Sequence, residues 1–140
     1  MAVPIPESHI NLIAGPVSVV LSTVMSDGQP QSTVVWCNYD GTHVLINTMS
    51  RFQKAKNLRA DPKVTLLAYE RENPLHYIEV RGTVVEMTED DAEEHLDQLA
   101  ELYVGKSPYF GEVIPAEWKD RETPVKCKIA PTRVRAETSE

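Results

Sequence analysis

The residue types that could do chemistry gather in one short basic segment, residues 47–64, which reads NTMSRFQKAKNLRADPKV. This segment holds five of the fourteen Lys and Arg residues of the chain but only one of its 21 acids. The five cations are Arg51, Lys54, Lys56, Arg59 and Lys63. Residues 1–50 contain neither Lys nor Arg, and the formal net charge of the chain is -7. Cations gathered in an otherwise acidic chain indicate a site for an anion.

The order of residues within the basic segment predicts how the anion is held. Ser50 and Gln53 have the Ser-x-x-Gln spacing of a capping box, which predicts a helix over residues 51–60 with Ser50 as its cap. Arg51 and Lys54 would then lie in the first turn, where the helix dipole disfavours cations unless an anion offsets their charge. Phosphate accepts hydrogen bonds from guanidinium, ammonium, hydroxyl and backbone N–H groups, so an organic phosphate is the natural candidate.

A second interpretation of the basic segment remains open at this point. It is a solvated helix whose cations pair with acids elsewhere in the chain. At about 100° per residue, Asn57 lies on the same side as Lys54, whereas Lys56 projects away from it. A nucleic-acid site is disfavoured, because the surrounding chain is acidic and no basic face with interleaved aromatic residues is visible.

Other catalytic and metal-binding motifs are absent from the sequence. No GxxxxGK[ST], GxGxxG or GxSxG pattern occurs, and the four histidines form no HxxxH or HExxH pair. Cys37 and Cys127 are far apart and belong to no Cys/His cluster, so we expect buried free thiols and no metal. If the chain is an enzyme, a cofactor must carry its chemistry, and no catalytic residue stands out.

The elements that must position the basic segment are mostly strands. Six runs rich in β-branched and apolar residues predict strands at residues 17–25, 31–39, 43–49, 63–69, 75–87 and 125–135. The pairs Asp27-Gly28 and Asp40-Gly41 predict tight turns, so the first three strands form an antiparallel meander. Gly82 predicts a bulge in the long strand.

A second helix is predicted over residues 89–104. Thr88 and Asp91 have capping-box spacing, and Gly105 is a typical stop. Strands in antiparallel order with two helices favour a mainly β (α+β) fold, a small closed or nearly closed β-barrel with flanking helices. We expect one domain over residues 1–140, a cytoplasmic location, and no membrane or nucleic-acid partner, because no signal peptide or long apolar run is visible.

Three motifs in this order resemble a known family. DGQPQ (27–31), KAKNLRADP (54–62) and RGTV (81–84) are similar to motifs of the pyridoxamine 5'-phosphate oxidase-like split β-barrel proteins. Within that family the chain looks most like the small enzymes that use the deazaflavin coenzyme F-420. The resemblance covers about residues 8–135. It implies an antiparallel split β-barrel and a homodimer with two flavin-type cofactors in grooves at the subunit interface.

The resemblance also implies a set of cofactor-binding residues. Those near the cofactor phosphate are Thr48, Arg51 and Lys54, adjoined by Asn47, Ser50, Phe52, Gln53 and Asn57. Those along the tricyclic ring are Gln31, Val34 and Trp36. Those that would reach the cofactor of the partner subunit are His76 and Tyr77. For Trp36 and Tyr77, packing inside a small barrel is an equal alternative.

The function implied is hydride transfer from F-420 to a small electron-poor acceptor such as a conjugated enone or a quinone-like compound. FMN in the same fold is the first alternative, since both cofactors carry a phosphate on a ribityl chain. Lys56 and Arg59 could receive the acidic glutamate tail of F-420, which favours F-420. Further alternatives are a non-catalytic flavin or haem carrier and a dimer without a ligand. The C-terminal residues CKIAPTRVRAETSE lack the Trp and Arg-Leu-x-Pro segment of pyridoxine phosphate oxidases, which disfavours that substrate.

Overall fold

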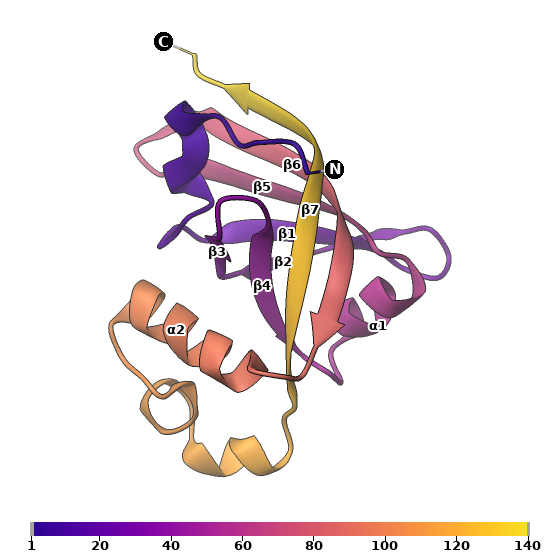
Figure 1. The fold of residues 1–140 in the computed structure, drawn as a ribbon, viewed down its shortest axis with the longest axis vertical. Coiled ribbons are helices and arrows are strands. Elements are labelled where there is room, and N and C mark those ends of the chain that lie inside the picture. The colour runs from indigo at the N-terminus through magenta and orange to yellow at the C-terminus, as the bar shows by residue number, and fades with distance from the viewer. Residues whose placement is uncertain (1, 140) are drawn as a thin grey trace.

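In the computed structural model, which describes residues 2–139, seven strands form one curled antiparallel sheet (Figure 1). The strands are β1 (Val19–Val24), β2 (Pro30–Val35), β3 (Cys37–Tyr39), β4 (Val44–Met49), β5 (Lys63–Glu70), β6 (Asn73–Thr88) and β7 (Pro124–Glu137). Their order across the sheet is β2-β1-β5-β6-β7-β4-β3, and neighbouring strands run antiparallel throughout. The predicted mainly β, antiparallel barrel architecture is therefore confirmed.

The inner face of this sheet forms the main hydrophobic core. Alternate side chains along β1, β4 and β5 are buried, as expected for strands with one face turned inward. The largest fully buried apolar side chains include Leu21, Ile46, Leu66, Ile78 and Ile129, which come from five different strands. Hydrophobic burial on this one face is what curls the sheet around its own interior.

The sheet closes on itself at Trp36, and here the predicted meander is wrong. The expected single strand over residues 31–39 is broken: β2 pairs with β1, whereas β3 pairs with β4. These two halves lie at opposite edges of the sheet, so the chain steps from one edge to the other across one residue. Val35 and Cys37 on either side both point into the core. The two Asp-Gly hairpins themselves are confirmed.

The first helix, α1 (Gln53–Ala60), begins two residues later than predicted. Ser50 is not its cap, because the Ser50 N–H donates to the Thr123 carbonyl at 2.8 Å and so extends the β4–β7 pairing. The Ser50 hydroxyl instead accepts a hydrogen bond from Arg59 at 2.9 Å. The predicted capping box is therefore wrong, and α1 starts without a side-chain cap.

The second helix, α2 (Ala92–Val104), ends where the sequence predicts, at Gly105 in a left-handed conformation (φ 69°). Its predicted capping box is wrong. The Thr88 hydroxyl accepts from the Asp90 N–H at 3.0 Å, and Asp91 itself is left-handed (φ 53°). The Asp91 carboxylate is turned to Lys126 on β7 at 2.8 Å, which ties the start of α2 to the barrel.

Three short helical turns complete the structure. They are η1 (Glu7–Leu12), which the sequence analysis missed, and η2 (Tyr109–Val113) and η3 (Ala116–Asp120), within the segment predicted to be irregular.

The predicted bulge at Gly82 is confirmed by a shift of the β6–β7 register there. A Cβ at Gly82 would stand 2.7 Å from Ile129 Cγ2 and 2.8 Å from the Ala130 carbonyl oxygen, so only glycine fits.

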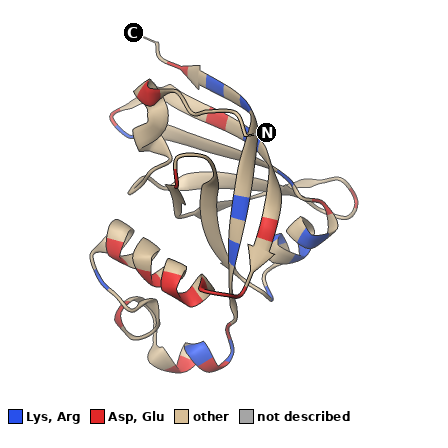
Figure 2. Ribbon diagram, viewed as in Figure 1, with Lys and Arg blue, Asp and Glu red and all other residues tan. Residues whose placement is uncertain are grey.

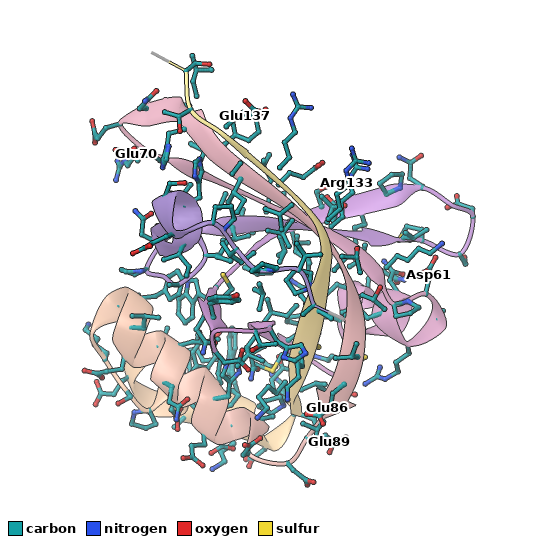
Figure 3. All side chains as sticks on the ribbon, turned by 45° about the horizontal axis from the view of Figure 1, so that its top comes forward. Asp61, Glu70, Glu86, Glu89, Arg133 and Glu137 are labelled. Atoms are coloured by element: carbon teal, nitrogen blue, oxygen red, sulfur yellow. The ribbon has the colours of Figure 1, made fainter. Side chains whose placement is uncertain are left out.

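Charges are separated between the two helices. Figure 2 shows acidic residues along α2 and basic residues on α1, on opposite sides of the lower barrel. Figure 3 places Glu86 and Glu89 beside the start of α2, whereas Asp61 lies at the far end of α1. The segment α2–η2–η3 joins β6 to β7 and gathers at one end of the barrel (Figure 1).

Within residues 2–139, no helix is long and apolar enough to cross a membrane, and no group of three or more His, Cys, Asp or Glu side chains could hold a metal ion. Cys37 and Cys127 are free and buried, as predicted. Burial raises the pKa of each thiol to about 12, so both stay protonated and unreactive.

Candidate functional site

A pocket of about 200 Å³ lies where the barrel closes at Trp36, and we call it the edge pocket. Its walls come from distant parts of the chain. β2 and its continuation supply residues 34–36, β4 supplies residues 47–49, and the start of α1 supplies Phe52 and Lys54. Leu96 and Leu99 of α2 and Tyr109 of η2 close the remaining side. The predicted site residues that it brings together are Val34, Trp36, Asn47, Thr48, Phe52 and Lys54.

Lys54 supplies the positive charge of the edge pocket. It is the second residue of α1, and its ammonium donates a hydrogen bond to Thr33 Oγ1 at 3.0 Å. The same nitrogen lies 5.7 Å from the centroid of the Phe52 ring. Partial burial lowers the pKa of Lys54, since desolvation disfavours the charged form. A half-buried ammonium with a neutral hydroxyl and an aromatic ring as its neighbours favours an anionic ligand.

Arg51 does not line the edge pocket but lies beside Phe52, which does, and, contrary to prediction, it is outside the helix. Its guanidinium forms a two-pronged ion pair with Glu122, through Nε to Oε1 and through Nη2 to Oε2 at 3.1 Å. The guanidinium carbon stands 5.0 Å from the centroid of the Phe52 ring. Because a guanidinium has five N–H donors, this pair leaves three of them for a ligand.

Gln31 and Gln53 form a hydrogen-bond network around the buried Asn57, and none of the three lines the edge pocket. Asn57 Nδ2 donates to Gln31 Oε1 at 3.1 Å and to Thr23 Oγ1 at 3.0 Å, and Asn57 Oδ1 accepts from Gln53 at 2.8 Å. The network fastens α1 to the β1–β2 hairpin. These residues therefore act by holding Lys54 in place.

The other predicted site residues also lie outside the edge pocket. The Ser50 hydroxyl is bound to Arg59, and Lys56 is exposed on α1. His76 stacks on the His9 ring at 4.0 Å. Tyr77 faces outward and lines a separate hollow on the outer face of β5 and β6. Neither His76 nor Tyr77 lines the edge pocket of its own chain.

His95 on α2, which sequence reasoning missed, sets the orientation of Asn47. The Nε2–H of its neutral ring donates to Asn38 Oδ1 at 2.8 Å, so its Nδ1 accepts from Asn47 Nδ2 at 3.2 Å. Asn47 Nδ2 also donates to the Ala92 carbonyl at 2.8 Å. Burial, aided by Lys126, lowers the pKa of His95 to about 4, which keeps the ring neutral. No spacing pattern in the sequence connects positions 38, 47 and 95.

Two oxygens in the wall of the edge pocket have no hydrogen-bond partner among the described residues, Asn47 Oδ1 and Thr48 Oγ1. A buried polar atom left unpaired costs about 1–3 kcal/mol. The Asn47 amide cannot rotate to exchange its oxygen and nitrogen, because its Nδ2 donates to the Ala92 carbonyl and to His95 Nδ1. Both oxygens are enclosed by protein atoms, so a ligand in the pocket does not reach them directly.

An aromatic cluster shapes the opposite end of the edge pocket. The Trp36 ring stacks on Tyr103 with centroids 5.2 Å apart and meets the edge of Tyr109 at 6.0 Å. The Tyr103 hydroxyl lies 2.7 Å from the Val17 carbonyl oxygen and accepts from the Cys37 N–H at 3.0 Å, so the stack is locked. A rigid aromatic wall with a cation at one end fits a planar ring system that bears a phosphate.

Comparisons with known proteins identify the family and the fold. Residues 5–136 match the family model described as pyridoxamine 5'-phosphate oxidase. Among solved structures, an F-420 reductase is 28% identical, with a TM-score of 0.80 over 94% of this chain and 98% of its own. A conserved hypothetical protein from Mycobacterium tuberculosis is 26% identical, with a TM-score of 0.69 over 97% and 86%. General Stress Protein 26 from Bacillus anthracis, 20% identical with a TM-score of 0.66 over 96% and 94%, shares the fold. No curated protein matches the chain.

Proposed function

The chain belongs to the pyridoxamine 5'-phosphate oxidase family, and we propose that it is an oxidoreductase that binds coenzyme F-420 non-covalently in the edge pocket. The observation that carries this proposal is the combination of one half-buried ammonium, that of Lys54, with a rigid aromatic wall at Trp36. The similarity to an F-420 reductase over nearly the whole of both chains supports the choice of cofactor.

Different residues in and beside the edge pocket would contact different parts of such a cofactor. Lys54 and Arg51 would bind the phosphate, and Thr48 and Asn47 would form the adjoining wall. Trp36 would border the ring system. When bound, F-420 supplies the hydride for reduction of a small electron-poor acceptor. The chain's own part is to orient both molecules and to exclude water with apolar side chains from α2.

A parallel fluorescence titration with F-420 and FMN tests the proposed function. We expect saturable binding of F-420, and reduction of a quinone such as menadione when the reduced coenzyme is supplied. If neither coenzyme binds at micromolar protein, the proposal fails. Tight binding of FMN with oxygen consumption during turnover would instead support an FMN enzyme, the alternative that the family description favours. Binding without reduction of any acceptor would indicate a carrier.

We further propose that two copies of the chain pair through the outer face of β2, β1 and β5. Val34, which also lines the edge pocket, is 67% exposed there, and Val20 stands between Val34 and Leu67 in the pairing register. Tyr77 lines a hollow beside Leu67 on this same face, where a second copy could meet it. Apolar side chains exposed side by side on a sheet favour association.

Light scattering tests the dimer. We expect twice the chain mass for the wild type, and a monomer with weakened cofactor binding for Leu67→Asp, which places a charge at the centre of that face. Lys128→Asp, on β7 of the same barrel, is the control for a new carboxylate elsewhere. A wild-type monomer that binds cofactor with full affinity would refute the pairing.

A further inference from the structure

The ion pair between Arg51 and Glu122 joins two side chains in very different surroundings. The Glu122 side chain is only 4% exposed, whereas that of Arg51 is 60% exposed. The backbone holds Glu122 where it is, because Thr123 accepts from the Ser50 N–H at 2.8 Å and Pro124 pairs with Met49. The position of the Glu122 carboxylate is therefore fixed by the fold, and the more exposed Arg51 side chain reaches over to pair with it.

This fixed charge lies beside the residues that would hold the cofactor phosphate. Arg51 and Lys54 both contact the Phe52 ring, at 5.0 and 5.7 Å from its centroid, and we call these three residues the phosphate corner. Among the described residues these are the two cations that lie over the Phe52 ring, whereas the Arg59 guanidinium is engaged with Ser50. With Glu122 counted, the phosphate corner carries two positive charges and one negative charge.

The net charge of such a corner decides which phosphate it prefers. The cost of taking an anion out of water grows with the square of its charge, whereas its attraction to the site grows only in proportion. A fixed negative charge therefore weakens binding of a doubly charged phosphate more than that of a singly charged one. The phosphomonoester of FMN has a second pKa of about 6 and is close to doubly charged at pH 7. The phosphate of F-420 is a diester and carries one charge.

We propose that Glu122 is a specificity residue: by neutralising Arg51, it matches the phosphate corner to a singly charged phosphodiester and disfavours the doubly charged phosphomonoester of FMN. This inference rests on the proposed function, since it names the chemical class of phosphate that the same pocket selects. It also accounts for the buried carboxylate that pairs with Arg51.

The test is the pH dependence of FMN binding, which compares the two charge states of one molecule. Dissociation constants for FMN and for riboflavin, which lacks the phosphate, are measured by flavin fluorescence between pH 5.5 and 7.5. The ratio of the two constants isolates the contribution of the phosphate. As the pH rises over this range, the preference for FMN over riboflavin should increase about fivefold more in Glu122→Gln than in the wild type. This is roughly the factor by which one unit charge about 4 Å from another changes binding in water. An equal pH dependence in both proteins overturns the proposal.

Control variants separate charge from geometry and guard against loss of folding. Glu117→Gln makes the same change on the exposed part of η3 and should keep the wild-type dependence. Glu122→Asp keeps the charge and should do the same. Arg51→Gln removes a positive charge from the phosphate corner, so the preference for FMN over riboflavin should increase less with pH than in the wild type. This variant keeps the test decisive if Glu122→Gln does not fold. If the wild type binds neither a flavin nor F-420, the proposed function has failed. If the wild type binds but Glu122→Gln shows the same pH dependence, only the specificity role of Glu122 has failed.

Discussion

Replacing Lys54 by methionine tests the electrostatic part of the site with little disturbance of its shape. Methionine keeps an unbranched chain that can lie on Phe52, but it removes the ammonium and its hydrogen bond to Thr33 Oγ1 at 3.0 Å. Thr33 is partly exposed, so water can replace the lost donor. Lys54→Met should therefore change the affinity for the ligand and leave the fold intact.

The expected loss follows from the surroundings of the ammonium. A hydrogen bond to a charged group contributes about 1.5–3 kcal/mol. Because Lys54 is only half withdrawn from water, we take about 2 kcal/mol, which corresponds to roughly 30-fold weaker binding of FMN or F-420. Riboflavin, which has no phosphate, should bind the variant and the wild type alike.

The stability of the unliganded protein provides an independent check. Burial lowers the pKa of Lys54 in the folded state, so the protonated side chain opposes folding at neutral pH. That cost disappears only as the pH rises towards the ordinary pKa of lysine. Lys54→Met should therefore leave Tm at pH 7 unchanged or slightly raised.

Fluorescence titration and thermal melts of three proteins complete the design. Lys63→Met makes the same substitution at an exposed lysine of the basic segment and serves as the control. An unchanged FMN affinity in Lys54→Met, or an equal loss for FMN and riboflavin, would refute the assignment of Lys54 to the phosphate.

Four further substitutions, one of them with a matched control, test other parts of the site. Lys56→Met should weaken F-420 several-fold but not FMN, if that exposed lysine meets the glutamate tail; equal titration curves for F-420 would exclude the contact. Trp36→Phe should abolish most of the tryptophan fluorescence change on cofactor binding, whereas Trp118→Phe, which alters a residue outside the edge-pocket lining, should preserve it. Asn57→Leu should lower stability by about 1–3 kcal/mol in urea melts, because Gln31 and Gln53 lose their partner; an unchanged midpoint would show that the network is dispensable. The pKa of His95 falls from 6.5 to about 4 on folding, so its contribution to stability is full above pH 6.5 and is lost as the pH falls to 4, by at most about 3 kcal/mol. His95→Gln should flatten that part of the profile of unfolding free energy, and a parallel profile would contradict the depressed pKa.

Local signals in the sequence predicted most of the fold. The Asp-Gly turns, the β-branched runs, the bulge at Gly82 and the helix stop at Gly105 depend on neighbouring residues, and all are present. The break at Trp36 could not be seen in this way. The inward alternation runs on from Val35 to Cys37 across the break, and only the closure of the whole sheet separates the partners of the two halves.

The site was predictable in its position along the chain but not in its partners. The basic segment indicated Lys54, which does line the edge pocket. It could not show that Thr123 would pair with Ser50 and displace the helix start, nor that Glu122 would take the guanidinium of Arg51. These contacts join residues about seventy positions apart, so they arise from the register of β4 with β7 and from no local pattern.

Residues 89–123, which supply Leu96, Leu99 and Tyr109 to the edge pocket, are in effect one long hairpin connection between the paired strands β6 and β7. The entropy of closing a loop grows only with the logarithm of its length, by about 0.6 kcal/mol for each doubling. Evolution can therefore lengthen, shorten or rewrite this connection at little thermodynamic expense while the barrel and its basic corner stay intact. This wall of the edge pocket is therefore the replaceable part of the protein, and a graft of this connection between relatives tests whether it sets their ligand preferences.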